Sequence, residues 1–135
     1  MFLLDTNVIS ELRRARPHGA VLAWLKPIPS SSLFVSAASI GEIQIGIEAT
    51  RGRDAAKAAE IERWLDGIEQ TLQVAALDAA SFRVWARLMQ RTSDDHMLDA
   101  MIAATAVSRG LTVASRNVRD FTGFGVAVVN PFSTA

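Results

Sequence analysis

Short apolar segments alternate with longer segments of helical periodicity along the whole chain. Each apolar segment has the length of a buried strand, and the segments between them place apolar residues three and four positions apart. Strands that alternate with helices pair in parallel through right-handed crossovers, so helices cover both faces of the sheet. The pattern therefore predicts an α/β fold in which a central parallel sheet lies between two helical layers.

The boundaries follow from the same pattern and from residues that stop helices. Prolines close the second helix, and glycines end the third and the last. The predicted strands are residues 2–4, 33–36, 72–77, 111–115 and 126–130. The predicted helices are residues 6–14, 19–26, 39–52, 54–70, 79–90 and 94–110, and residues 117–125 are predicted to form a loop or a single turn. No linker interrupts this series, so we expect residues 1–135 to form a single domain.

Composition narrows the class of protein. Half of the 135 residues are hydrophobic and 21% are charged, which is typical of a folded globular chain. The 14 basic and 14 acidic residues cancel, so net charge does not indicate nucleic-acid binding, although an acidic pocket with a basic rim would also give zero. The chain has no cysteine, so any metal must be held by oxygen or histidine ligands.

Apolar run lengths bear on location. No run approaches the roughly 18 residues of a membrane span. The first run is four residues long, has no basic leader and is followed by Asp5, so we expect no secretory signal and a cytoplasmic location.

Acidic side chains gather at the predicted carboxyl ends of the strands, where ligands bind in sheets of this type. Asp5 ends the first strand, Glu42 lies in the first turns of the helix after the second, and Asn117 and Asp120 follow the fourth. Asp99 lies early in the helix that precedes the fourth strand. Converging carboxylates repel one another unless a cation neutralises them. Oxygen ligands suit Mg²⁺ or Mn²⁺, so the sequence predicts a divalent-metal site able to act on a phosphodiester.

Two of these residues also have a structural explanation. Asp5 could cap the helix that begins at the next residue. Glu42 follows Ser39 by three residues, which is the spacing of a capping box. Taken alone, either explanation is at least as good as a functional one.

The other acids have structural alternatives as well. Asp99 could pair with His96 one turn earlier, and Asp120 could be a turn residue. Asp99 is harder to explain as a cap, because Asp94 and Asp95 already offer that function.

The histidines and tryptophans are interpreted as structural. His18 and His96 stand in no recognisable catalytic arrangement, so a general-base function is not favoured for either. The three tryptophans lie on apolar helical faces and are interpreted as core or dimer contacts: Trp24, Trp64 and Trp85.

Four motifs in series resemble the PIN-domain ribonuclease toxins of the VapC type. They are "LLDTNVISEL", "SAASIGEIQIGI", "LDAMIAATAVSRGLTVASRNVRDF" and "VVNPF", and together they span residues 2 to about 132. The resemblance implies a three-layer α/β/α sandwich and an endoribonuclease that requires Mg²⁺ or Mn²⁺ and leaves a 5′-phosphate and a 3′-hydroxyl. It also implies a cognate antitoxin and a homodimer, with residues 8–14 and 59–65 as candidate docking faces.

The resemblance also assigns residues to the site. The first three acids match Asp5, Glu42 and Asp99, and Asp120 is preferred over Asn117 as the fourth. Supporting positions match Thr6, Asn7, Ser115 and Asn117, with Ser115 in the place of a common threonine. Arg116 and Arg119 are the candidate RNA contacts.

Other functions remain open at this stage. A non-catalytic or weakly catalytic module that regulates transcription with its antitoxin keeps the same fold. Whether Asp120 or Asn117 faces the other acids distinguishes the two functions. DNA is an alternative substrate, because phosphate contacts do not separate the two nucleic acids. A phosphotransfer enzyme is disfavoured, since "LDTNV" lacks the second aspartate of a DxD nucleophile.

Overall fold

A five-stranded parallel sheet forms the centre of the molecule. The structure is a computed structural model and describes residues 1–133. Within these residues the strand order is β3-β2-β1-β4-β5, and every pair is parallel. The strands are β1 (Phe2–Leu4), β2 (Leu33–Ser36), β3 (Gln73–Ala75), β4 (Thr112–Ala114) and β5 (Val128–Val129). The parallel sheet predicted from the alternating pattern is confirmed.

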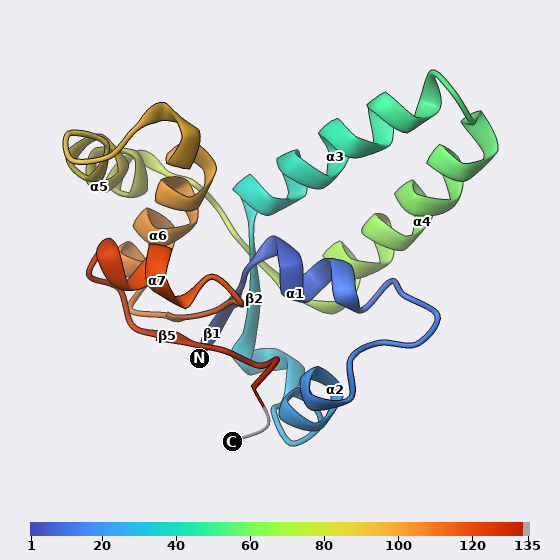
Figure 1. Cartoon of the computed structure of the whole chain (residues 1–135), viewed down its shortest axis with the longest axis horizontal. Coiled ribbons are helices and arrows are strands. Elements are labelled where there is room, and N and C mark those ends of the chain that lie inside the picture. The colour runs from blue at the N-terminus through green and yellow to red at the C-terminus, as the bar shows by residue number, and fades with distance from the viewer. Residues whose placement is uncertain (134–135) are drawn as a thin grey trace.

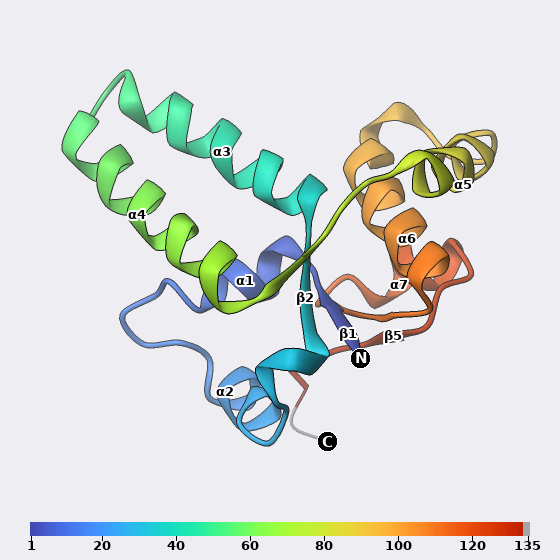
Figure 2. The ribbon, with the colours of Figure 1, turned by 180° about the vertical axis from the view of Figure 1, so that it is seen from behind.

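Helices cover both faces of this sheet. The helices are α1 (Thr6–Glu11), α2 (Gly19–Leu25), α3 (Ala37–Arg51), α4 (Ala55–Thr71), α5 (Ala79–Met89), α6 (Met97–Arg109) and α7 (Val118–Gly123), with short 3-10 turns at Ser30–Ser32 and Asp94–His96. Figure 1 shows α1, α3 and α4 on one side of the strands and α5, α6 and α7 on the other. The view from behind in Figure 2 agrees, so the predicted three-layer sandwich is confirmed.

The central strand β1 divides the core into two parts. Successive side chains of a strand point to opposite faces. Leu3 packs in the cluster that includes Ile102 and Phe121 of the α5–α7 side. Leu4 packs in the cluster that includes Val8 and Val35, on the side of α1 and α2. Both leucines have no exposed surface, which explains why the strands consist of continuous apolar runs.

Several predicted boundaries were wrong. The first helix stops at Glu11, because Arg13, Arg14 and Arg16 offer no apolar side chain to bury and are exposed. Helix α3 begins at Ala37, two residues earlier than predicted. The predicted strands around β3 and β5 are shorter in the structure.

The segments beside the acidic residues also differ from the prediction. The helix predicted over residues 94–110 is divided into a 3-10 turn and α6. Residues predicted as a loop or a single turn form α7, whose Phe121 is fully buried. Gly110 ends α6 with φ 66°, the left-handed conformation that favours glycine at this position.

Candidate metal centre

Asp5 lies where β1 meets α1, close to the middle of the sheet edge. Its backbone N–H donates to the carbonyl of Ala114 at 2.9 Å. Its Oδ1 accepts a 2.8 Å hydrogen bond from the backbone N–H of Thr6, so Asp5 is the N-cap of α1. Its Oδ2 accepts a 2.6 Å hydrogen bond from the hydroxyl of Ser115. The capping explanation is therefore correct, but it involves only one of the two carboxylate oxygens.

Burial makes the charge on Asp5 costly. The residue is 3% exposed, and desolvation raises its pKa from 3.8 to about 6. The hydrogen bonds from Ser115 and Thr6 lower this pKa, whereas the charges of Asp99 and Glu42 raise it. The carboxylate thus carries an unfavourable charge in the absence of a cation.

Asn7 and Ser115 hold Asp5 in place. The Asn7 amide nitrogen lies 3.3 Å from Asp5 Oδ2 and 3.4 Å from the Ser115 hydroxyl, and it donates to both. Asn7 Oδ1 accepts from the backbone N–H of Arg116 at 3.3 Å. The Ser115 hydroxyl also accepts from the backbone N–H of Asn117 at 2.9 Å. These bonds join the segments after β1 and β4, and they fix the orientation of the first acid.

Glu42 is not part of a capping box. Helix α3 begins at Ala37, and its N-cap is Ser36, whose hydroxyl accepts a 3.1 Å bond from the backbone N–H of Ala38. Glu42 therefore lies in the second turn, and the capping interpretation was wrong. The hydroxyl of Ser39 instead accepts a 2.9 Å bond from the Thr6 hydroxyl, which ties α1 to α3.

Glu42 shares a cavity with the other predicted site residues. The cavity has a volume of about 280 Å³. It is lined by Asp5, Thr6, Asn7, Glu42, Asp99 and Asn117. The carboxyl ends of neighbouring parallel strands meet at this edge, which explains why residues distant in sequence lie together.

Asp99 faces a second group of ligands. Its pKa is raised mainly by burial and then by the charges of Asp120 and Glu42, while His96 opposes the shift. The ligand atoms of His96, Asp99 and Asp120 all lie within 4.8 Å of one another. Among residues 1–133 this is the one group of three potential ligands with such close spacing. Asp99 therefore borders both the cavity with Asp5 and the group with Asp120.

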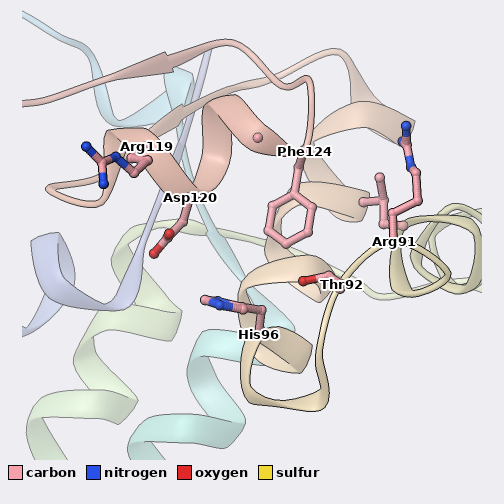
Figure 3. Close-up of a pocket in the computed structure, with 8 residues that line it drawn as sticks. Arg91, Thr92, His96, Arg119, Asp120 and Phe124 are labelled. Carbon is pink, nitrogen blue, oxygen red and sulfur yellow. The ribbon is translucent and has the colours of Figure 1, made fainter.

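Asn117 and Asp120 occupy different parts of this region. Asn117 precedes α7 and lines the cavity with Asp5. Asp120 lies in the first turn of α7 and lines an adjoining cavity of about 230 Å³ with His96 and Arg119. Figure 3 shows the Asp120 carboxylate of α7 and the His96 imidazole extending from two elements into the same space. Interpreting Asp120 only as a turn residue does not explain why its carboxylate lies beside His96 and Asp99.

Basic and aromatic side chains border the acidic residues. Arg119, Arg91 and Phe124 line the adjoining cavity. The guanidinium carbon of Arg116 lies 3.8 Å from the ring centre of Phe132, a cation–π contact. Sequence reasoning missed Arg91, because nothing in the residues around it indicates that this segment packs beside α7.

The other histidine and the tryptophans have structural roles. His18 caps α2, since its Nδ1 accepts a 3.2 Å hydrogen bond from the backbone N–H of Ala20. Trp24, Trp64 and Trp85 pack against the buried clusters. Sequence reasoning was right about these residues. It also allowed for a pair between His96 and Asp99, and the two side chains do approach to 3.9 Å, but it missed that Asp120 lies beside them.

Comparison with known proteins places this arrangement in a family. The family model described as the PIN domain matches residues 2–124. The chain belongs to the PIN-domain family. This match includes all four acids and both arginines predicted to lie at the site.

Similarity to individual PIN-family proteins extends over the whole chain. The VapC ribonuclease Y4jK of Sinorhizobium fredii is 36% identical over 143 residues, which cover 100% of both chains. Toxin FitB of Neisseria gonorrhoeae is 32% identical over 142 residues, which cover 98% of this chain and 99% of that protein. The structure of FitAB bound to an IR36 DNA fragment superposes with a TM-score of 0.81 at 28% identity, covering 100% of this chain and 98% of the other.

Proposed function

We propose that this PIN-domain protein is a metal-dependent endoribonuclease, the toxin of a type II toxin–antitoxin pair that acts in the cytoplasm. The observation that carries the proposal is the meeting of Asp5, Glu42, Asp99 and Asp120 at one sheet edge. The identity to a VapC ribonuclease over the full chain supports the same activity.

The donor set at this edge fits a divalent cation. Asp5, Glu42 and Asp99 offer carboxylate oxygens around one cavity, and the charge on Asp5 is unfavourable without a neutralising partner. Such hard ligands suit Mg²⁺ and Mn²⁺, which retain several waters, so part of the coordination can pass through water. When bound, the cation supplies stabilisation of negative charge on the phosphodiester and promotes ionisation of water.

The residues of this chain have distinct functions in that reaction. Asp5, Glu42 and Asp99 would hold the cation, and Asp120 would complete the acidic set. Ser115 and Asn7 keep Asp5 oriented through their hydrogen bonds. Attack of water on phosphorus breaks the bond to the 3′-oxygen, which takes up a proton and leaves as the 3′-hydroxyl, while the phosphate stays on the 5′ side.

The RNA contacts are assigned to the basic side chains beside the acids. Arg119 lines the cavity next to Asp120, so its guanidinium can neutralise a phosphate near the scissile one. The guanidinium of Arg116 is held over the Phe132 ring. This contact keeps a second positively charged side chain just beyond the carboxyl end of β4. Asn117, with its backbone N–H bonded to Ser115, supports the cavity without adding charge.

The non-catalytic alternative depends on a weak fourth acidic position. A carboxylate oxygen of Asp120 lies within 4.8 Å of one of Asp99, and this spacing favours the catalytic function over a purely regulatory one. The FitAB structure is described as bound to a DNA fragment, so a complex with the antitoxin on DNA is proposed in addition to the nuclease activity.

A groove beside the acidic cavity is the proposed antitoxin site. Its lining joins the two predicted docking segments, through Arg13 after α1 and through Ile61 and Trp64 of α4, and it also includes Glu42. A segment seated there would cover the acids from one side. Ile61→Asp should weaken antitoxin binding in a pull-down of the co-expressed pair while RNA cleavage is retained. Unchanged binding by a folded variant would contradict this placement.

Self-association is proposed as well. Phe82 of α5 and Val107 of α6 are large apolar side chains with more than a third of their surface exposed, and a second copy of the chain would cover them. Sedimentation at micromolar concentration should therefore show a dimer, and a monomer alone would contradict it.

The nuclease activity is tested with purified, antitoxin-free protein and total RNA. Reactions contain Mg²⁺, Mn²⁺ or EDTA, and Asp99→Asn is compared with Asp66→Asn, a substitution of an exposed carboxylate on α4. We expect discrete cleavage with either metal, none in EDTA, loss in Asp99→Asn and full activity in Asp66→Asn. Cleavage that persists in EDTA or in folded Asp99→Asn would contradict the proposal.

A further inference from the structure

Arg116 lies directly beyond the carboxyl end of β4, beside the acidic cavity. Its backbone N–H donates to Oδ1 of Asn7 at 3.3 Å, and the Asn7 amide in turn donates to Asp5. Its two neighbours in the chain are Ser115, which is bonded to Asp5, and Asn117, which lines the cavity. The backbone of Arg116 is therefore fixed to the residues that hold the first acid.

Phe132 holds the Arg116 side chain in place. The guanidinium carbon lies 3.8 Å from the centre of the Phe132 ring, which is van der Waals contact, so the ring covers one side of the guanidinium. Figure 1 shows the chain after β5 running toward α2. There residues 130–133 form a turn in which Asn130 Oδ1 accepts a 2.9 Å hydrogen bond from the backbone N–H of Phe132. The ring also meets the imidazole of His18 edge-on, with 5.5 Å between the two ring centres. The phenylalanine is thus held by the C-terminal turn and by the start of α2.

The stability of the fold does not explain this arrangement. Arg116 is exposed, and a cation–π contact at an exposed site is weak. Among residues 1–133 no ion pair involves Arg116, and its guanidinium makes no hydrogen bond. Within that part of the chain its N–H donors are therefore left for a ligand, and so is the face of the guanidinium turned away from Phe132. The ring orients the guanidinium without using its donors.

We propose that Arg116 and Phe132 form a stacking site for one nucleobase of a single-stranded RNA, with the base lying on the open face of the guanidinium. This inference rests on the proposed function, which makes RNA the substrate of the adjacent acidic cavity. Proteins bind single-stranded RNA by stacking its bases on aromatic rings and on the guanidinium planes of arginines. Phe132 is the positioning residue of this site, because it acts on the base through Arg116.

A stacking site can be distinguished from a phosphate contact. A phosphate contact requires positive charge, which lysine also supplies. Stacking requires the planar guanidinium, which lysine lacks. Arg116→Lys therefore keeps the charge and removes the plane. Phe132→Leu keeps an apolar side chain and removes the ring that orients the guanidinium, whereas Phe132→Tyr retains the ring.

The test measures RNA binding without cleavage, by fluorescence anisotropy in EDTA at low ionic strength. The two probes are a short labelled oligoadenylate and an abasic ribose-phosphate oligomer of the same length and charge. Any effect of the missing bases on the free probe cancels when the same pair is compared between proteins. We expect the wild type to prefer the oligoadenylate. Arg116→Lys and Phe132→Leu should lower this preference on the order of 5-fold, near the lower end for one stacked base, and Phe132→Tyr should retain it. Arg53→Lys, the same exchange at an exposed arginine between α3 and α4, should retain it as well.

Two results would overturn the inference. One is the same preference for the oligoadenylate in the wild type and in folded Arg116→Lys, because charge alone would then account for Arg116. The other is equal affinity of the wild type for the two probes. Either result would leave the nuclease proposal intact, since cleavage of total RNA is measured separately in the presence of metal. A preference that depends on Arg116, in a protein that cleaves no RNA with either metal, would support the stacking site and overturn the nuclease proposal.

Discussion

Replacing Asp5 with asparagine tests whether the acidic edge is costly to the metal-free protein. The pKa of Asp5 is raised from 3.8 to about 6, so the unfolded chain loses its proton at lower pH than the folded one. The contribution of Asp5 to the free energy of unfolding is therefore fully present below pH 3.8 and is lost as pH rises through about 6. A shift of about two units corresponds to roughly 3 kcal/mol. Asp5→Asn removes this titration. Its free energy of unfolding should therefore rise relative to that of the wild type, by about the same amount, as pH increases over this range.

Urea unfolding in EDTA at a series of pH values measures this difference. Only the pH-dependent part reports the carboxylate, because the other effects of the amide are constant with pH. Asp66→Asn, at an exposed position of α4, should give a flat difference. Adding Mg²⁺ at neutral pH should stabilise the wild type and not Asp5→Asn. If the difference in unfolding free energy between Asp5→Asn and the wild type were also independent of pH, the reasoning that the desolvated carboxylate destabilises the metal-free fold would be refuted.

Three further substitutions test the supports of the site. Ser115→Ala removes the 2.6 Å hydrogen bond to Asp5 and should raise the pKa of Asp5 further in an NMR titration. Ser115→Thr keeps a hydroxyl and should return this pKa to the wild-type value. Equal pKa values in the wild type and both variants would contradict the expectation. Gly110→Ala places a side chain on a residue with φ 66° and should lower the free energy of unfolding by about 1–2 kcal/mol. An unchanged midpoint of thermal unfolding would contradict this. Phe121→Ala removes a fully buried ring and should cost about 3–5 kcal/mol, measured by urea unfolding, and a cost under about 1 kcal/mol would show that α7 is not anchored there.

The sequence was sufficient to predict the fold, because its signals are local and repeated. Strands of continuous apolar residues and helices of period 3.6 require a parallel sheet with two helical layers, whatever the details of each boundary. The errors lie where the local signal is weak. Residues 94–96 carry adjacent acids that suit either a helix start or a turn, and α7 depends on one buried ring rather than on a repeated pattern.

The site was predictable where topology alone determines position. Asp5 follows directly from the end of a central strand, and the parallel edge brings Glu42 and Asp99 to the same cavity. The pairing of His96 with Asp99 was predictable from their spacing of one helical turn. The approach of Asp120 to the same pair was not predictable, since it depends on how α7 packs against α6. Arg91 was missed for a similar reason, because its approach to α7 depends on packing between distant elements.

The charged edge has an energetic consequence for how fold and function are connected. Asp5 caps α1 through one oxygen, and an uncharged asparagine could serve as a cap equally well. The carboxylate instead raises the free energy of the folded, metal-free state, and Asp99 adds a second raised pKa nearby. A cation reverses that cost at both residues at once, since it favours the charged form of every carboxylate around it. The same groups that weaken the metal-free fold therefore provide the affinity for the ion, so stability and catalysis should rise together as metal is added.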